Sequence, residues 1–204
     1  MQLKVEHLCQ KAENHLRQSA AVKQLVVEKC LNSIVEAACL IADTFQLGNK
    51  LLLCGNGGSA ADCQHMASEL VSRLTKDFDR PGLPAIALTT DTSYLTAFAN
   101  DCGFEGVFER QIQALGQPGD VLIGISTSGN SPNIIRAIKT AKALNMKTIA
   151  ITGNNGGLLS GIVDVAIVVP SPDTQYIQES HIAIEHILCG LVEYQLFGDG
   201  GKLY

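Results

Sequence analysis

The sequence has no long apolar run, no basic run and no paired-cysteine motif, and each absence excludes a class of protein. No apolar stretch reaches the roughly 18 residues that a membrane-spanning helix needs. Residues 1–15 are too polar for a secretory signal peptide. The net charge is −5 without a basic cluster, so we expect neither a nucleic-acid-binding surface nor a membrane protein.

The seven cysteines are scattered along the chain, and none forms a C-x-x-C pair. This pattern favours reduced thiols in the cytoplasm over a disulfide framework, with each cysteine a small buried core residue. Charged residues make up 17% of the chain and hydrophobic residues 46%, which excludes a disordered protein. We therefore expect a folded cytoplasmic protein whose residues 1–204 form a single domain.

Short apolar segments alternate with helical patterns after residue 50. Strands are predicted at 51–54, 84–89, 120–125, 147–152 and 163–169. Helical patterns cover 59–72, 94–115 in one or two pieces, 132–145 and 174–197, with a short turn near 157–161. The strands are continuously apolar, as in strands that are buried on both faces. The order predicts an α/β fold with a parallel sheet and helices on both sides.

Two helices, 2–18 and 20–46, are predicted before the first strand, and Gly48-Asn49 ends the second. Two helices exceed what a small sheet needs for cover. The segment 1–48 therefore packs either on its own domain or on a neighbouring subunit, and the pattern leaves both open. The glycine-rich residues 198–201 are expected to be flexible.

The segment Leu51–Glu69 combines an apolar strand, a glycine-rich turn and the start of a helix. The glycines at 55, 57 and 58 let the backbone turn sharply and approach a ligand closely. Ser59 is expected to cap the helix, and His65 and Glu69 lie one turn apart on one face. The turn suits an anion, whereas the polar pair suits a metal ion or a proton transfer.

A second polar loop follows the predicted strand 120–125 and carries the hydroxyl residues Ser126, Thr127, Ser128 and Ser131. Pro132 stands in the first turn of the next helix, whose free N–H groups and dipole attract an anion. The loop has no lysine, so it is not the nucleotide-binding P-loop. A monophosphate held by hydroxyl and amide groups fits better.

These motifs together resemble the phosphoheptose isomerase family of sugar isomerase (SIS) domain proteins. The resemblance rests on CGNGGSAADCQHMASEL, PGLPAIALTTD, ANDCGF, GISTSGNS and IQESHIAIEH, in this order over nearly the whole chain. It implies a flavodoxin-like sheet of five strands, a homotetramer with active sites at subunit interfaces, and one zinc ion per subunit. It also implies conversion of sedoheptulose 7-phosphate to D-glycero-D-manno-heptose 7-phosphate, for heptose-containing glycan precursors such as those of lipopolysaccharide.

The resemblance also assigns residues to the site. The implied substrate-binding residues are Asn56, Gly57, Gly58, Ser59, Glu69, Arg73, Asn100, Asp101, Ser126, Thr127, Ser128, Ser131 and Gln178. The implied metal ligands are His65, Glu69, Gln178 and His186. Gln178 and His186 stand about 12 Å apart along an ideal helix, so one ion between them needs both side chains extended. His181 and Glu185, on the same helix, compete as ligands or as plain polar surface.

An aldose–ketose isomerase moves a proton between adjacent carbons through an enediol, which needs a base and an acid. Glu69 is the candidate base and His186 the candidate acid. A zinc ion beside them would polarise the substrate oxygens.

Three other functions remain open at this point. The spacing Gly55-x-Gly57-x-x-Ala60 after a strand fits a dinucleotide-binding fingerprint, but the acidic residue expected about 20 positions later is missing. The chain could also be a non-catalytic SIS protein, such as one that associates with a replication initiator, or an isomerase for another phosphosugar.

Overall fold

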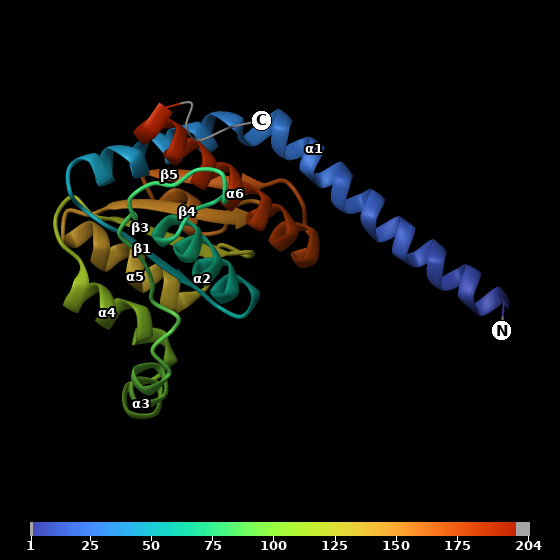
Figure 1. Cartoon of the computed structure of the whole chain (residues 1–204). Helices are drawn as coiled ribbons and strands as arrows, with labels where there is room; N and C mark the ends of the chain where they lie inside the picture. Colours follow the sequence, from blue (N-terminus) through green and yellow to red (C-terminus); the bar gives the residue numbers. More distant parts are fainter. Residues whose placement is uncertain (1, 199–204) are drawn as a thin grey trace.

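The computed structural model describes residues 2–198 and contains one parallel sheet of five strands (Figure 1). The strand order is β2-β1-β3-β4-β5. The strands are β1 (Leu51–Gly55), β2 (Ala85–Ala87), β3 (Val121–Ser126), β4 (Lys147–Gly153) and β5 (Val165–Val169). Every residue of β1 and β3 is buried, which explains why these strands are apolar throughout. The predicted α/β fold is confirmed.

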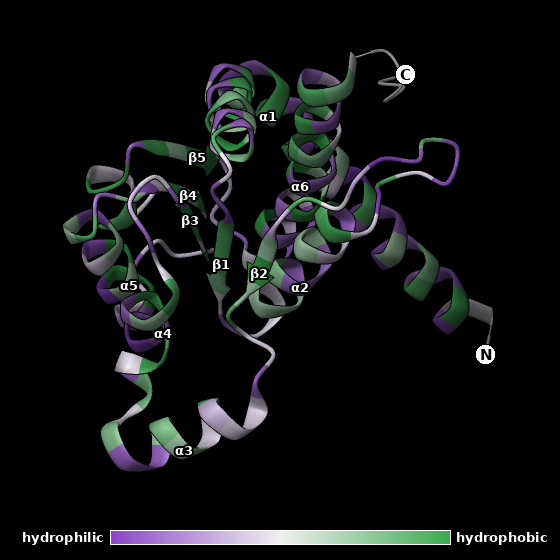
Figure 2. Ribbon diagram, turned by 60° about the vertical axis from the view of Figure 1, so that its left-hand side comes forward, coloured by the Kyte–Doolittle hydropathy of each residue, from purple (hydrophilic) through white to green (hydrophobic). Residues whose placement is uncertain are grey.

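Helices cover both faces of the sheet. One face packs against α1 (Gln2–Gln46), α2 (Gly58–Val71) and α6 (Thr174–Phe197), and the other against α4 (Val107–Leu115) and α5 (Pro132–Ala143). Figure 2 shows the hydrophobic strands enclosed between these two layers. In the sheet, β1 has β2 on one side and β3 on the other, so the strand order reverses direction at β1. The carboxyl ends of β1 and β3 therefore flank the crevice where such sheets bind ligands.

The region 94–115, predicted to be helical in one or two pieces, forms two helices. Gly103, at φ +89°, ends α3 (Thr92–Cys102), and a short 3-10 helix (Phe104–Gly106) leads into α4. No residue of α3 is buried, and this helix lies apart from the rest of the molecule in both views (Figure 1 and Figure 2). A second 3-10 helix (Leu159–Gly161) corresponds to the predicted turn near 157–161.

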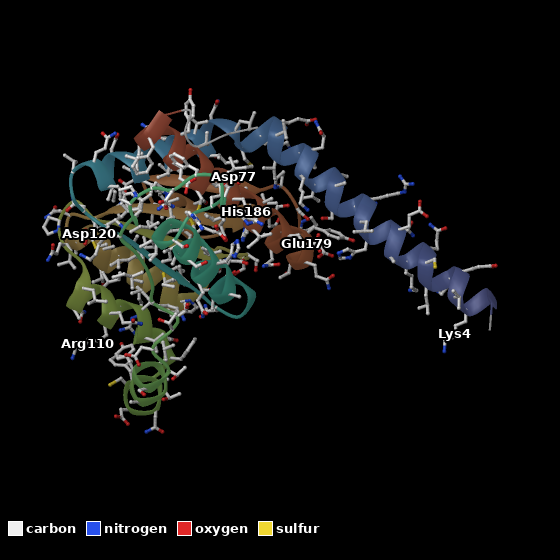
Figure 3. The ribbon with its side chains drawn as sticks, in the orientation of Figure 1. Lys4, Asp77, Arg110, Asp120, Glu179 and His186 are labelled. Carbon is white, nitrogen blue, oxygen red and sulfur yellow. The ribbon has the colours of Figure 1, made fainter. Side chains whose placement is uncertain are left out.

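The prediction of two N-terminal helices is wrong, because α1 is one continuous helix of 45 residues. Residues 1–47 contain no glycine or proline, so nothing in the sequence breaks the helix at Ser19. The Ser19 hydroxyl instead donates a hydrogen bond to Glu179 on α6, close to where α1 meets α6 (Figure 3). The part of α1 from Val22 to Ala42 packs on the chain's own core, whereas the first part projects into solvent (Figure 1).

The cysteines of the described chain are all free thiols. Four of them are buried as predicted, but Cys9, Cys39 and Cys102 are exposed, because they lie on the outer sides of α1 and α3. The expectation of a buried role is therefore wrong for these three. Residues 199–201 of the predicted flexible tail lie outside the described residues. Within residues 2–198, none of the helices is both long enough and apolar enough to cross a membrane.

Candidate active site

The glycine-rich turn after β1 opens the site at the carboxyl edge of the sheet. Gly57, at φ +56°, is the N-cap of α2, and no side chain caps the helix. The prediction that Ser59 caps the helix is wrong: the left-handed glycine lets the helix begin at Gly58, and Ser59 is buried inside the first turn. The first-turn N–H groups are thus not occupied by a side-chain cap and can meet an anion.

A pair of asparagines joins this turn to the helix after the serine loop. The amides of Asn56 and Asn133 exchange two hydrogen bonds, of 3.0 and 2.9 Å. Asn133 is 3% exposed and also accepts the N–H of Ile134 at 3.0 Å. The sequence analysis did not include Asn133 among the site residues. Its position directly after Pro132, beside the serine loop, could have indicated it. The contact holds the two candidate anion-binding loops next to each other.

The serine loop after β3 brings its hydroxyl groups together. The Oγ atoms of Ser126 and Ser131 lie 2.9 Å apart, and those of Ser126 and Ser128 lie 3.5 Å apart. Ser131 is the N-cap of α5 with Pro132 in the first turn, as predicted, and its hydroxyl does not cap the helix. Three serine hydroxyls thus lie together at the N-terminus of α5, an arrangement that suits a phosphate.

The loop after β4 packs against the serine loop and forms hydrogen bonds with it. Gly129 has φ +65°, and a Cβ there would lie 2.0 Å from the carbonyl oxygen of Gly156. The N–H of Leu159 donates to the Gly129 carbonyl at 3.0 Å, and the N–H of Leu158 donates to the Asn130 side chain at 3.0 Å. The shape of the serine loop thus depends on a close backbone contact that only glycine permits.

Two histidines from different helices meet at the face between α2 and α6. The Nε2 atoms of His65 on α2 and His186 on α6 lie 2.8 Å apart, which is a hydrogen-bonding distance. Glu69 lies one turn beyond His65, with its Oε1 atom 3.8 Å from the His65 Nε2 atom. Figure 3 marks His186 between these two helices, near the centre of the molecule. An acid–base set of two imidazoles and one carboxylate is therefore assembled here.

Comparisons with known proteins agree with this geometry. Residues 14–153 match the model of the SIS domain family. The chain is 52% identical to the phosphoheptose isomerase of Maridesulfovibrio salexigens over 194 residues, which is 95% of this chain and 94% of the relative. It is 55% identical to that of Aquifex aeolicus over 186 residues, which is 91% of this chain and 96% of the relative.

The chain belongs to the phosphoheptose isomerase family of SIS-domain proteins. Its fold is similar to the solved structure of phosphoheptose isomerase GmhA from Neisseria gonorrhoeae, with a TM-score of 0.86 at 44% identity over 91% of this chain and 98% of that chain. Neither the dinucleotide-binding reading nor the non-catalytic reading gains support from these relatives.

Gln178, one of the metal ligands that the family resemblance implies, is hydrogen-bonded to a carboxylate on α2. Gln178 donates from Nε2 to Oδ1 of Asp62 at 2.6 Å, which leaves its amide oxygen as the free acceptor. Asp62 lies one turn before His65 on α2, so Gln178, which is on α6 with His186, reaches the helix that carries His65. Within residues 2–198, no group of three or more His, Cys, Asp or Glu side chains has the arrangement of a metal site. Among the predicted ligands, His65 contacts both His186 and Glu69, whereas Gln178 is hydrogen-bonded to Asp62.

Three ionisable residues near the histidines, Asp62, His181 and Glu185, are buried. Both His181 and Glu185 are fully buried, so the reading of these residues as polar surface is wrong. Among the described residues, neither carboxylate oxygen of Glu185 has a hydrogen-bond partner. Burial and the nearby Asp62 raise the pKa of Glu185 to about 9, and burial raises the pKa of Asp62 to about 6. Burial lowers the pKa of His181 to about 4, and its Nε2 donates to the Thr152 carbonyl at 3.0 Å.

Three predicted substrate-binding residues make no hydrogen bond or ion pair with the histidines, Glu69 or the serine loop among the described residues. Asn100 and Asp101 are exposed on α3, where the Asn100 amide donates to Asp101 at 2.8 Å. Arg73 lies just beyond α2, and its guanidinium is 3.7 Å from the exposed Asp79. The sequence could not show where Asn100 and Asp101 lie. Their position depends on how α3 packs on the rest of the protein, and none of its residues is buried.

Proposed function

We propose that this chain is a phosphoheptose isomerase, an aldose–ketose isomerase that converts sedoheptulose 7-phosphate to D-glycero-D-manno-heptose 7-phosphate for heptose and glycan precursors such as those of lipopolysaccharide. Membership of the family supports the reaction. The observation that carries it is the meeting of Glu69, His65 and His186 between α2 and α6, two helices that pack on the sheet whose strand β3 bears the serine loop. Incubation of the purified protein with sedoheptulose 7-phosphate, with the product identified by NMR, tests it directly.

In this proposal the two loops bind and the two helices perform the chemistry. The serine loop and the glycine turn hold the phosphate and orient the sugar chain, with Asn56, Ser59, Thr127 and Gln178 as further contacts. Glu69 removes the proton from C1 of the ketose while His186 donates a proton to the carbonyl oxygen, which yields the enediol. Glu69 then returns the proton to C2, and the hydroxyl proton on O1 is released to His186. The contact between His65 and His186 keeps the His186 ring oriented and shares its proton.

We also propose that His65, Glu69, Gln178 and His186 hold one Zn²⁺ per subunit. Imidazole nitrogens and a carboxylate oxygen are typical zinc ligands, and the free amide oxygen of Gln178 is a further oxygen donor. When bound, the ion would polarise the substrate oxygens as a Lewis acid. All four residues fit the ion by ligand type, and His65, Glu69 and His186 also fit by proximity.

The serine loop provides a test of phosphate binding. We expect the Ser126→Ala, Ser128→Ala double variant to raise KM strongly and to change kcat little, because the acid–base residues lie on other elements. Each hydrogen bond to a charged group contributes about 1.5–3 kcal/mol, or roughly 10–100-fold in affinity. Steady-state kinetics measure this, with Ser33→Ala on α1 as the control because its hydroxyl donates only to the carbonyl of Cys30. Unchanged KM in the double variant would place the phosphate elsewhere.

We further propose a cytoplasmic homotetramer whose active sites lie at subunit interfaces. On α1, Val27, Leu31 and Val35 repeat every fourth residue and form an apolar stripe whose members are each about half exposed, and Leu8 and Leu16 are further exposed apolar residues on the projecting part. Exposed apolar surface of this kind marks a protein interface. A site shared between subunits would also give the exposed Arg73, Asn100 and Asp101 a place beside the substrate.

Assembly can be measured by light scattering. The protein is expected to run with the mass of four chains, and Leu31→Glu should produce smaller species because it places a charge within the apolar stripe. Lys29→Glu, on the same turn but outside the stripe, is the matched control. A fully active monomer would contradict the tetramer.

A further inference from the structure

The loop after α2, residues 72–83, is folded back by a buried ion pair. The side chains of Arg80 and Glu193 are 1% and 3% exposed. Nε of Arg80 donates to Oε1 of Glu193, on α6, at 2.7 Å. The N–H of Leu74 donates to the same oxygen at 3.2 Å. Glu193 thus joins both ends of the loop to α6.

The guanidinium of Arg80 also binds the end of α2. Nη2 donates to the carbonyl of Glu69 at 2.8 Å, and Nη1 donates to the carbonyl of Leu70 at 2.6 Å. Carbonyls in the last turn of a helix lack partners within the helix and carry partial negative charge, which suits a cation. One of these carbonyls belongs to the residue proposed as the base. Arg80 therefore holds the backbone of Glu69 directly.

Besides the Gln178–Asp62 hydrogen bond, the two helices that carry the chemistry are joined at two points. The first is the contact between His65 and His186, at 2.8 Å. The second is the Arg80–Glu193 clamp, which binds α2 at Glu69 and α6 at a position seven residues, or about 10.5 Å along the helix, beyond His186. We propose that Arg80 and Glu193 are positioning residues for the isomerase reaction, which set the placement of Glu69 on α2 relative to His186 on α6. This inference rests on the proposed function.

The chemistry of the clamp favours this role over plain stabilisation. A buried ion pair is a weak source of stability, because removing two charges from water offsets most of their attraction. An apolar pair would pack α2 on α6 at least as well, but it could not bind two backbone carbonyls and a carboxylate at once. The planar guanidinium does so with a rigid set of donors that a lysine lacks. Reacting groups displaced by about 1 Å lose on the order of 10²-fold in rate.

Two variants test the clamp. Arg80→Lys keeps the buried charge but not the fork of donors. The Arg80→Met, Glu193→Leu double variant removes both charges, and such replacements are often neutral or stabilising. We expect kcat for sedoheptulose 7-phosphate to fall about 10–100-fold in both, with KM within about threefold of the wild type, because the serine loop is untouched. Kinetics by NMR and thermal unfolding are measured on the same samples.

The control is a second arginine–glutamate pair that lies far from the two helices. Arg136 on α5 donates to Glu109 on α4 at 2.7 Å, so Arg136→Met, Glu109→Leu should leave kcat unchanged. A clamp variant as stable as the wild type with normal kcat overturns the inference, and if the double variant does not fold, Arg80→Lys decides alone. A wild-type protein without isomerase activity would instead overturn the proposed function, so the two failures are distinct.

Discussion

Glu69→Gln is expected to slow turnover by about 10²–10⁴-fold while the sugar phosphate still binds. The substitution keeps the shape of the side chain but removes its charge and basicity, so the carbon-bound proton loses its acceptor. The serine loop, which is proposed to hold the phosphate, does not involve this residue. Steady-state kinetics give kcat, and calorimetry gives the affinity for the substrate.

The interpretation requires that the variant keep its metal and its fold, because Glu69 is also a proposed ligand. Zinc is therefore measured by elemental analysis on the same sample. Glu105→Gln is the matched control, since its carboxylate is 70% exposed and faces only Arg136, at 3.9 Å. A Glu69→Gln protein with full zinc and near-normal kcat would show that another residue is the base.

Removal of zinc by dialysis against a chelator is expected to lower kcat by about 10²-fold or more, because Lewis-acid polarisation of substrate oxygens contributes several kcal/mol. Addition of one equivalent of Zn²⁺ per chain should restore the rate. His65→Gln should bind less zinc, since it removes one of the two imidazole ligands from the face between α2 and α6. Ser126→Ala is the control that should keep its zinc, because its hydroxyl faces Ser131 on the serine loop. Full activity in protein that contains no zinc would refute the metal proposal.

The elements of the fold that bear the site could be predicted because they depend on local patterns. The apolar runs of β1 and β3 indicated strands buried on both faces, and this burial is complete in the structure. Pro132 begins a helix because its fixed backbone conformation suits the first turn. The division of α1 at Ser19 was predicted wrongly, since a polar residue within a helix can face another helix instead of ending its own.

The sequence by itself determined that His65 and Glu69 share one face of α2, because the helical period sets the spacing of residues four apart. It also determined a hydroxyl-rich loop before Pro132 and, through its motifs, the family. Only the tertiary structure decided that His186 meets His65, that Asn56 pairs with Asn133, and that Arg80 clamps Glu193. These partners are 121, 77 and 113 residues apart along the chain. Their contacts depend on how α2, α5 and α6 pack on the sheet, and the spacing of residues within one element carries no information about that packing.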